Sequence, residues 1–239
     1  CPEFLPYLGL KFEGSKKILF NQSQSWRYID KQLKLQDIGK TYIDLGYDYV
    51  INCSEYLSDM LNKYMKIPVG TISNGIDHTK FYSRNEKRIE KRILALSRKN
   101  PADIQIIKDK LKGSGCDLRV VDGLTENELI DEYQQADIFL STGYPEGFSL
   151  PPLEAMGCGC VVVGFTGGGA SEFMTNGETA LVSDDGDTDD VVKQVEKLLL
   201  DTELKEKIRE AGLNKSKEYT LENTKRMISG FYQMIEREG

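Results

Sequence analysis

Short apolar runs alternate with segments of helical periodicity along most of the chain. In the second half, runs typical of buried strands recur at residues 93–97, 118–122, 138–142, 160–165 and 180–182. The segments between and after them repeat apolar residues at helical spacing, which predicts helices over residues 102–111, 126–136, 151–156, 171–174, 189–200, 203–219 and 221–236. This βα alternation predicts a doubly wound α/β domain with a mostly parallel sheet.

The opening third of the chain follows the same alternation with fewer elements. Strands are expected at residues 17–20, 47–53 and 69–72, and helices at residues 25–38 and 54–65. Ser54 is a typical N-cap, and Leu57, Leu61 and Tyr64 share one face of the helix that follows it. These elements are too few for a complete doubly wound domain, and the turn formers of residues 73–81 mark a boundary before the second series.

Composition and charge limit the classes of protein that fit. With 239 residues, 39% of them hydrophobic, the chain is long enough for one large domain or two smaller ones. The 31 Lys and Arg against 38 Asp and Glu give a net charge of −7, which argues against nucleic-acid binding as the main task. Residues 1–90 hold 13 basic and 11 acidic residues, which leaves 18 against 27 for the rest, so the first part is the side expected to face an anionic partner.

Histidine and cysteine usage removes further classes. The single histidine, His78, excludes sites built on histidine clusters and disfavours a Ser-His-Asp triad. The five cysteines are scattered without C-x2-C pairs, which indicates a reducing, cytoplasmic setting, and Cys158 and Cys160 are expected to be small buried thiols. No apolar run reaches the length of a membrane span, and the first residues do not follow the signal-peptide pattern. Because the chain begins with Cys1 and has too few strands in its first part, we expect it to be a piece of a longer protein.

In an open parallel sheet, ligands bind beyond the carboxyl ends of the strands, so the loops that follow the strands are the candidate sites. Arg98 and Lys99 follow the strand at residues 93–97, and Pro101 opens the next helix. Two adjacent cations near a helix N-terminus suit an anionic group, although a solvated charged turn fits this loop equally well.

The loop after residues 138–142 carries two glutamates. Glu146 lies in the loop, and Glu154 lies in the first turns of a helix that begins with prolines, so both are expected to face one pocket. Glu154 could accept two hydrogen bonds from ribose hydroxyls or only stabilise the helix dipole. For either glutamate taken alone, a structural or solvated role is the simpler interpretation.

A glycine-rich turn follows the strand at residues 160–165. Its backbone amides, at Gly167, Gly168 and Gly169, suit close contact with phosphate or sugar oxygens, and Glu172 follows in a short helix. The turn is neither G-x-G-x-x-G nor a Walker loop, so it indicates little by itself.

Taken in order, these segments resemble a known family. Residues 137–169 resemble the donor-site segment of family 4 glycosyltransferases (glycosyl transferases group 1), with its E-x7-E motif, small-residue strand and Gly-Gly turn with a nearby Glu. The motif positions fall on Glu146, Glu154, Gly167, Gly168 and Glu172. Upstream, residues 73–77 (Ser-Asn-Gly-Ile-Asp) with Phe81 look like the family's linker motif.

The resemblance implies an α/β fold of GT-B type. It implies a partial, acceptor-side N-terminal Rossmann-like domain over residues 1–78 that lacks its opening half. A nucleotide-sugar-binding Rossmann-like domain over residues 79–220 would follow, and a C-terminal helix over residues 221–239 would cross back toward the first domain.

The resemblance also implies roles for single residues. Glu154 would accept the ribose hydroxyls, Glu146 would lie beside the transferring sugar, and Arg98 and Lys99 would neutralise the diphosphate, so that no metal ion or other cofactor is required. The remaining donor-binding positions would be Gly147, Phe148, Ser149, Leu150, Gly167, Gly168, Gly169 and Glu172. The chain departs from the family in one respect, because its two cations are adjacent rather than about five residues apart.

The function implied is a retaining glycosyltransferase. It would move a sugar from a nucleoside-diphosphate sugar to a sugar or lipid-linked acceptor, with no nucleic-acid partner. The alternatives are a fragment that binds nucleotide-sugar without transfer and a GT-B nucleotide-sugar epimerase. A cytoplasmic protein of this kind can contact the inner face of a membrane; here the basic residues Lys11, Lys16, Lys17, Arg27 and Lys31 would be the place, unless they form a solvated face.

Overall fold

The structure is a computed structural model of the chain that describes residues 7–24, 34–67 and 69–238. Backbone contacts divide the chain into two compact units. The first unit comprises Cys1–Asn74 with Glu222–Gly239, and the second unit comprises Gly75–Leu221. Each unit has its own parallel sheet.

The second unit is built on a five-stranded sheet with the order β5-β4-β6-β7-β8. All four pairings between neighbouring strands are parallel. The strands are β4 (Arg92–Leu96), β5 (Asp117–Val121), β6 (Ile138–Ser141), β7 (Val161–Gly164) and β8 (Leu181–Val182). The predicted strands of this half are all present, within one or two residues of the expected bounds.

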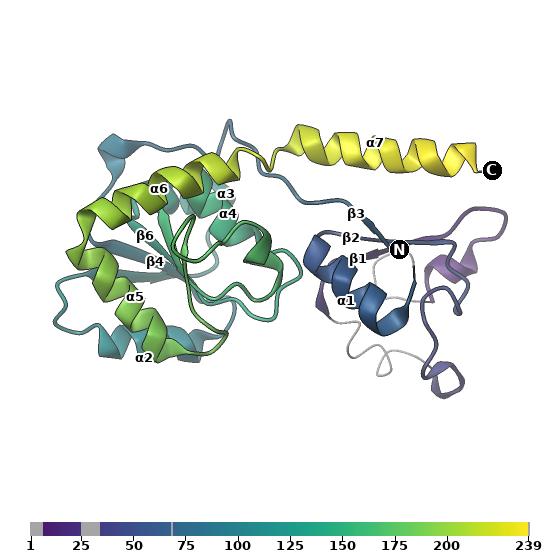
Figure 1. Ribbon diagram of the computed structural model, residues 1–239, viewed down its shortest axis with the longest axis horizontal. Helices are drawn as coiled ribbons and strands as arrows, with labels where there is room; N and C mark the ends of the chain where they lie inside the picture. The colour runs from purple at the N-terminus through teal and green to yellow at the C-terminus, as the bar shows by residue number, and fades with distance from the viewer. Residues whose placement is uncertain (1–6, 25–33, 68, 239) are drawn as a thin grey trace. The chain divides into compact units, whose positions relative to one another are not determined.

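Helices cover both faces of this sheet, as Figure 1 shows. Helix α2 packs with α5 on one face, and α3 packs with α4 on the other. The helices are α2 (Pro101–Lys110), α3 (Glu126–Gln135), α4 (Leu150–Gly157), α5 (Thr188–Leu200) and α6 (Thr202–Ser216). Local sequence explains their starts: Pro101 begins α2, where its missing N–H costs nothing, and Thr125 forms a capping box with Glu128 ahead of α3.

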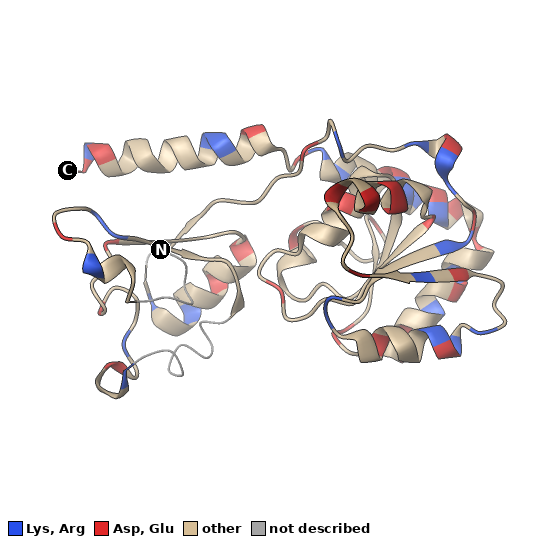
Figure 2. Cartoon of the chain, turned by 180° about the vertical axis from the view of Figure 1, so that it is seen from behind, with Lys and Arg blue, Asp and Glu red and all other residues tan. Residues whose placement is uncertain are grey.

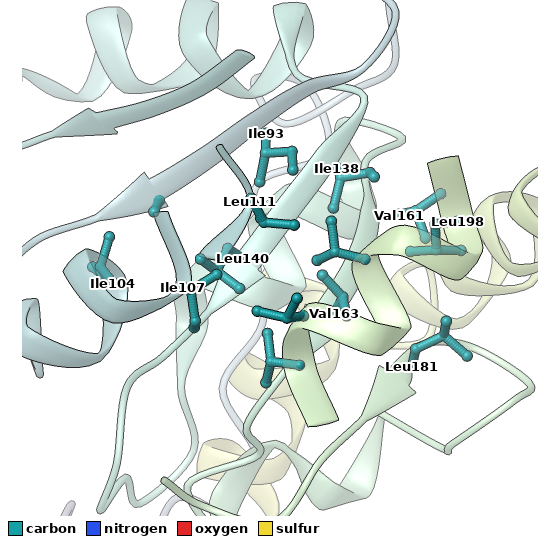
Figure 3. Packing of buried hydrophobic residues seen from close by; sticks show 14 of the residues in the cluster. Ile93, Ile104, Ile107, Leu111, Ile138, Leu140, Val161, Val163, Leu181 and Leu198 are labelled. Carbon is teal, nitrogen blue, oxygen red and sulfur yellow. The ribbon is translucent and has the colours of Figure 1, made fainter. Parts of the chain in front are cut away.

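The main core lies between the sheet and the helices α2 and α5, which cover one of its faces (Figure 3). Alternate residues of β4, β6 and β7 point into it, and apolar residues of α2 and α5 meet them from the other side. The fully buried members include Ile93, Ile107, Ile138, Leu140, Val161, Val163 and Leu198. This packing holds the carboxyl ends of β4 and β6 next to each other.

A buried ion cluster lies at the amino end of β6. The Asp137 carboxylate is 2% exposed and contacts Lys205 Nζ at 2.8 Å and an Arg209 guanidinium nitrogen at 2.5 Å. It also accepts a hydrogen bond from the backbone N–H of Lys91 at 3.0 Å. Burial alone would raise the pKa of Asp137, but the hydrogen bonds from Lys205 and Lys91 and the charge of Arg209 outweigh it and hold the pKa below its ordinary value.

The first unit has a three-stranded parallel sheet, β1-β2-β3. Its strands are β1 (Ile18–Asn21), β2 (Tyr49–Asn52) and β3 (Val69–Thr71). Helix α1 (Glu55–Met65) joins β2 to β3, and Ser54 caps it by accepting the N–H of Leu57, as predicted. Leu19, Tyr42, Val50 and Leu61 form its core.

The C-terminal helix α7 (Leu221–Arg237) belongs to the first unit from Glu222 onward. The ring of Phe231 meets that of Tyr49 edge to face at 5.9 Å, and Thr224 Oγ1 donates to the Ser73 carbonyl at 2.8 Å. Residues far apart in the sequence therefore share one unit.

Two short segments of the second unit pair where the chain enters and leaves it. The N–H of Ile76 donates to the Tyr219 carbonyl at 3.1 Å, and Ile76 and Thr220 form a parallel bridge. A Cβ at Gly75 would overlap the backbone of Thr220, so the close approach requires glycine. The boundary between the two units lies between residues 74 and 75, whereas the sequence places it after residue 78.

One predicted helix differs from the structure. The helix expected over residues 25–38 lies mostly outside the described residues, and its end is a single 3₁₀ turn, Leu35–Asp37. There the Asp37 carboxylate accepts hydrogen bonds from Tyr7 Oη and Lys40 Nζ, both at 2.7 Å, and Gly39 has a φ of +84°. These contacts favour a turn over continued helix.

Charges of both signs lie side by side along the helices of the second unit (Figure 2). Among the basic residues named as the place for a membrane contact or a solvated face, Lys16 donates to Tyr49 Oη and to the Ile235 carbonyl, both at 3.4 Å. Arg27 and Lys31 lie outside the described residues. Within the described part of the chain, no helix combines the length and the apolar character needed to span a membrane.

Candidate functional site

The candidate site lies at the switch point of the second sheet. After β4 the chain passes through α2 to β5, and after β6 it passes through α4 to β7, on opposite faces and in opposite directions. The loops that leave β4 and β6 therefore diverge and leave a crevice at the carboxyl edge, which is where open α/β sheets bind ligands.

The loop after β4 supplies two cations. Arg98 is exposed, with 62% of its side chain accessible, and Lys99 is half-buried. Both contact the same carboxylate oxygen, Glu146 Oε1, at 3.2 Å for Arg98 Nη2 and 2.9 Å for Lys99 Nζ. Glu146 has only 13% of its side chain exposed, so the two cations surround a largely buried carboxylate. The structure thus brings together the three residues predicted to be catalytic.

Asn100 connects the two loops through its side chain. It occupies the left-handed region, with a φ of 50°, just before α2. Its amide nitrogen donates to the Thr142 carbonyl at 2.9 Å and to the Tyr144 carbonyl at 3.0 Å, and Lys99 Nζ donates to the Pro145 carbonyl at 3.0 Å. The loop that carries Glu146 is therefore held by the loop that carries the cations.

The glycine turn after β7 packs directly against Glu146. The N–H of Glu146 donates to the Gly167 carbonyl at 2.8 Å, and the N–H of Gly169 donates to the Glu146 carbonyl at 3.3 Å. A Cβ at Gly169 would overlap the backbone of Gly147, and a Cβ at Gly167 would lie 2.5 Å from the Gly143 carbonyl oxygen. The glycines are required because two backbone segments touch. The amides of Gly167 and Gly168 donate to Asp185 Oδ1 at 3.1 Å and Thr166 Oγ1 at 3.2 Å.

The segment after Glu146 contributes mainly its backbone. The ring of Phe148 is buried and packs on Phe173 at 5.6 Å and on Tyr219 at 5.8 Å, so only its main chain can face a ligand. Ser149, with a φ of 69°, precedes α4, and Leu150 begins the helix and is partly exposed. Ser149 lines the same small cavity as Arg98 and Glu146.

Glu172 ends the short helix Gly169–Glu172. Its side chain is half-buried, and its carbonyl accepts a hydrogen bond from Tyr219 Oη at 3.3 Å. It follows the glycine turn directly, as the sequence predicts.

Glu154 does not share the cavity of Glu146, which corrects the expectation that both face one pocket. The residues that line that cavity come from the ends of β4 and β6, the loop to Glu146 and the first turn of α4. Glu154 lies one helical turn further along and accepts a hydrogen bond from Tyr133 Oη of α3 at 3.2 Å. Pro151 and Pro152 of α4 line the cavity, whereas the side chain of Glu154 is buried against Tyr133.

Burial dominates the chemistry of Glu154. Burial raises the pKa of this carboxyl, the hydrogen bond from Tyr133 lowers it, and the nearby charge of Glu126 raises it; together they bring the pKa to about 7. Near neutral pH, Glu154 therefore exchanges between a carboxylate, which only accepts hydrogen bonds, and an acid.

The thiols of Cys158 and Cys160 are buried, as predicted. Burial raises the pKa of both, that of Cys160 to about 12. They are inert at neutral pH because only the thiolate reacts or binds metals.

Sequence reasoning missed the residues that hold the loops in place. These are Asn100, Tyr133, Tyr144, whose hydroxyl donates to Asp103 at 3.0 Å, and Asp185, which accepts the N–H of Gly167 at 3.1 Å. An Asn before a helix-opening Pro, and an Asp in the loop after the strand at residues 180–182, are visible signals for two of them. Nothing in the sequence indicates that the phenol of Tyr133 meets Glu154.

Comparison with protein families gives a match over residues 111–215, to the family described as Glycosyl transferases group 1. The D-inositol 3-phosphate glycosyltransferase of Corynebacterium jeikeium is 33% identical over 102 residues, which are 43% of this chain and 24% of that protein. The match spans only 14 to 24% of the length of the first two curated relatives.

Solved structures give a likeness over the whole chain. The sucrose-phosphate synthase of Thermosynechococcus elongatus has a TM-score of 0.77 at 16% identity, covering 100% of this chain and 73% of that one. Anabaena Alr3699/HepE, solved in complex with UDP-glucose, has a TM-score of 0.64 at 15% identity, covering 91% of this chain and 79% of that one.

Proposed function

Since this chain has the GT-B fold and is a member of the glycosyl transferases group 1 family, as its motifs predict, we propose that it transfers a sugar from a nucleoside-diphosphate sugar to a sugar or lipid-linked acceptor. The observation that carries the proposal is the meeting of Arg98, Lys99 and Glu146 at the switch point of the second sheet. One of its structural neighbours is solved with UDP-glucose, which supports a donor of this class.

In the proposed complex the diphosphate lies against Arg98 and Lys99. The two cations stabilise the charge that develops on the leaving group, the work that a metal ion does in other transferases. The backbone amides of Gly147, Ser149 and Leu150, with the glycine turn and Glu172, face the sugar. Glu154 accepts hydrogen bonds from the ribose hydroxyls.

We propose that the transfer retains the configuration of the sugar. The acceptor hydroxyl oxygen forms a bond to the anomeric carbon on the face from which the diphosphate leaves. The bond between that carbon and the diphosphate oxygen breaks, and the acceptor proton passes to the departing diphosphate. In this complex Glu146 lies beside the transferring sugar, and its contacts with Lys99 and the Gly167 carbonyl support this position.

A thermal-melt panel tests donor binding. The chain is melted with UDP, GDP, dTDP, ADP and their common sugars, beside the variant Glu154→Ala. A ligand at 100 times its dissociation constant adds about 2.7 kcal/mol, which raises the midpoint of a unit of this size by several degrees. We expect one base to give a shift that the variant loses. A panel without any shift contradicts donor binding by this chain.

Glu146→Gln is expected to bind the nucleoside diphosphate more tightly than the wild type. The Glu146 carboxylate contacts both cations, so a diphosphate must compete with it for them. Each of these two ionic contacts is worth up to ~1 kcal/mol, so removing both should tighten binding roughly fivefold or more. Titration calorimetry at low salt measures the change, and an unchanged affinity in the variant would place the diphosphate away from these cations.

Affinity for a nucleotide sugar is expected to fall as the pH drops from 8 to 6. Burial raises the pKa of Glu154 to about 7, so acidification converts its carboxylate into an acid that accepts hydroxyl hydrogen bonds poorly. A nucleotide sugar is the right probe because its diphosphate is esterified at both ends and does not titrate in this range. Glu154→Gln should bind weakly and equally at both pH values; a wild-type affinity that does not change excludes Glu154 as the ribose acceptor.

A further inference from the structure

Tyr133 joins the candidate site through a single buried hydrogen bond. Its hydroxyl donates to Glu154 Oε2 at 3.2 Å, and its side chain is fully buried. Within the described part of the chain it is the one side chain that hydrogen-bonds to Glu154. The inference drawn from it rests on the proposed function, in which Glu154 holds the ribose.

The surroundings of Tyr133 fix the direction of its hydroxyl. The ring meets Phe139 of β6 edge to face at 5.5 Å and Phe81 at 6.4 Å. The carbonyl of Tyr133 accepts a hydrogen bond from Cys160 Sγ at 3.1 Å, which ties the backbone of α3 to the start of β7. A ring packed on two sides and a tethered backbone leave the phenol one orientation, toward α4.

We propose that Tyr133 is a positioning residue for the nucleotide-sugar donor. Its hydroxyl aims the Glu154 carboxylate at the ribose and stabilises the ionised form of that carboxylate. The hydrogen bond occupies one oxygen and sets the rotation of the carboxylate. A carboxylate has lone pairs left on both oxygens, so it can still accept the two ribose hydroxyls. Tyr133 acts through Glu154 and touches no substrate itself.

The charges around Glu154 show why a hydrogen bond from the Tyr133 hydroxyl matters. Burial and the Glu126 carboxylate both favour the neutral acid, and the Tyr133 hydroxyl opposes them. Lys80 is paired with Glu126 at 2.8 Å and does not contact Glu154. The Cys158 thiol, also near Glu154, stays neutral because burial raises its pKa. Burial also raises the pKa of Tyr133 far above its ordinary value. The phenol therefore keeps its proton and remains a hydrogen-bond donor from pH 6 to pH 9.

Tyr133→Phe removes the hydroxyl and leaves the ring in its packing. Nucleotide-sugar affinity is measured from pH 6 to pH 9 in this variant, in the wild type and in Tyr42→Phe, a control at a fully buried tyrosine of the first unit. A hydrogen bond to a charged group contributes on the order of one pKa unit or more, so the midpoint of the pH profile should rise by about one pH unit in Tyr133→Phe alone. Above the new midpoint its affinity should return to within about threefold of the wild type, because the carboxylate is then restored.

A second measurement needs no ligand. The Glu154 carboxyl is titrated by carbon-13 NMR in the free protein, assigned by its loss in Glu154→Gln, and its midpoint should rise in Tyr133→Phe. Incorporation of 3-fluorotyrosine, whose phenol is a stronger donor, should move the midpoint down and serves if the phenylalanine variant does not fold. Midpoints that stay at the wild-type value overturn the role of Tyr133. A wild type that binds no nucleotide sugar, but whose Glu154 titration responds to Tyr133→Phe, contradicts the proposed function instead.

Discussion

Arg98→Ala is expected to lower the rate of sugar transfer about a hundredfold or more. In the proposed transition state, negative charge develops on the departing diphosphate, and Arg98 is one of two cations placed to stabilise it. Removing one preorganised charge stabiliser of this kind costs about 2.7 to 4 kcal/mol of activation free energy. The measurement is the release of nucleoside diphosphate from the donor that the melt panel identifies.

The matched control is Lys193→Ala, which removes an exposed cation from α5 of the same unit. It should transfer at the wild-type rate, because α5 packs on the face of the sheet away from α4. Equal rates for Arg98→Ala and the control would remove Arg98 from the mechanism.

Asp137→Asn is expected to destabilise the second unit by about 3 kcal/mol or more. The substitution leaves Lys205 and Arg209 buried without their shared counter-ion, and breaking a buried pair from one side costs ~3–5 kcal/mol. Urea unfolding followed by circular dichroism measures the loss. Asp117→Asn, which breaks an exposed pair with Arg92, is the control and should cost about 1 kcal/mol or less.

The difference in stability between the wild type and Asp137→Asn should depend on pH. The folded pKa of Asp137 lies below its ordinary value, so its stabilisation is complete above the unfolded pKa of about 4 and is lost as the pH falls toward the folded one. The difference between the wild type and Asp137→Asn should therefore be largest near neutral pH and shrink in acid. A difference that grows in acid would mean that Asp137 is not held ionised by the cluster.

The second unit could be predicted from sequence because its local signals agree with its packing. The central strands Ile138–Ser141 and Val161–Gly164 are buried on both faces and are mostly apolar. Pro101, the N-cap Thr125 and the prolines after Leu150 mark the starts of three helices. Local propensity and tertiary environment favour the same structure there. The first unit is less regular: where the sequence predicts the end of a helix over residues 25–38, the structure has the 3₁₀ turn Leu35–Asp37, whose Asp37 contacts the distant Tyr7.

Part of the candidate site could be predicted from the sequence for a similar reason. Arg98, Lys99, Glu146 and the glycine turn lie directly after strands, and a parallel sheet brings such positions together. The direction of Glu154 was not readable, because it depends on how α4 is rotated and on the phenol of Tyr133 from another helix. Neither the contact of Asn100 with two carbonyls nor that of Asp185 with Gly167 follows from spacing along the chain.

Titration calorimetry of the nucleoside diphosphate selected by the melt panel tests the central claim most directly. The wild type is compared with Arg98→Ala, Glu154→Gln and the Lys193→Ala control. We expect one nucleotide per chain, affinities lowered about tenfold or more in the first two variants, and wild-type affinity in the control. The same affinity in all four proteins would contradict it, since the nucleotide would then bind away from the carboxyl edge of β4 and β6.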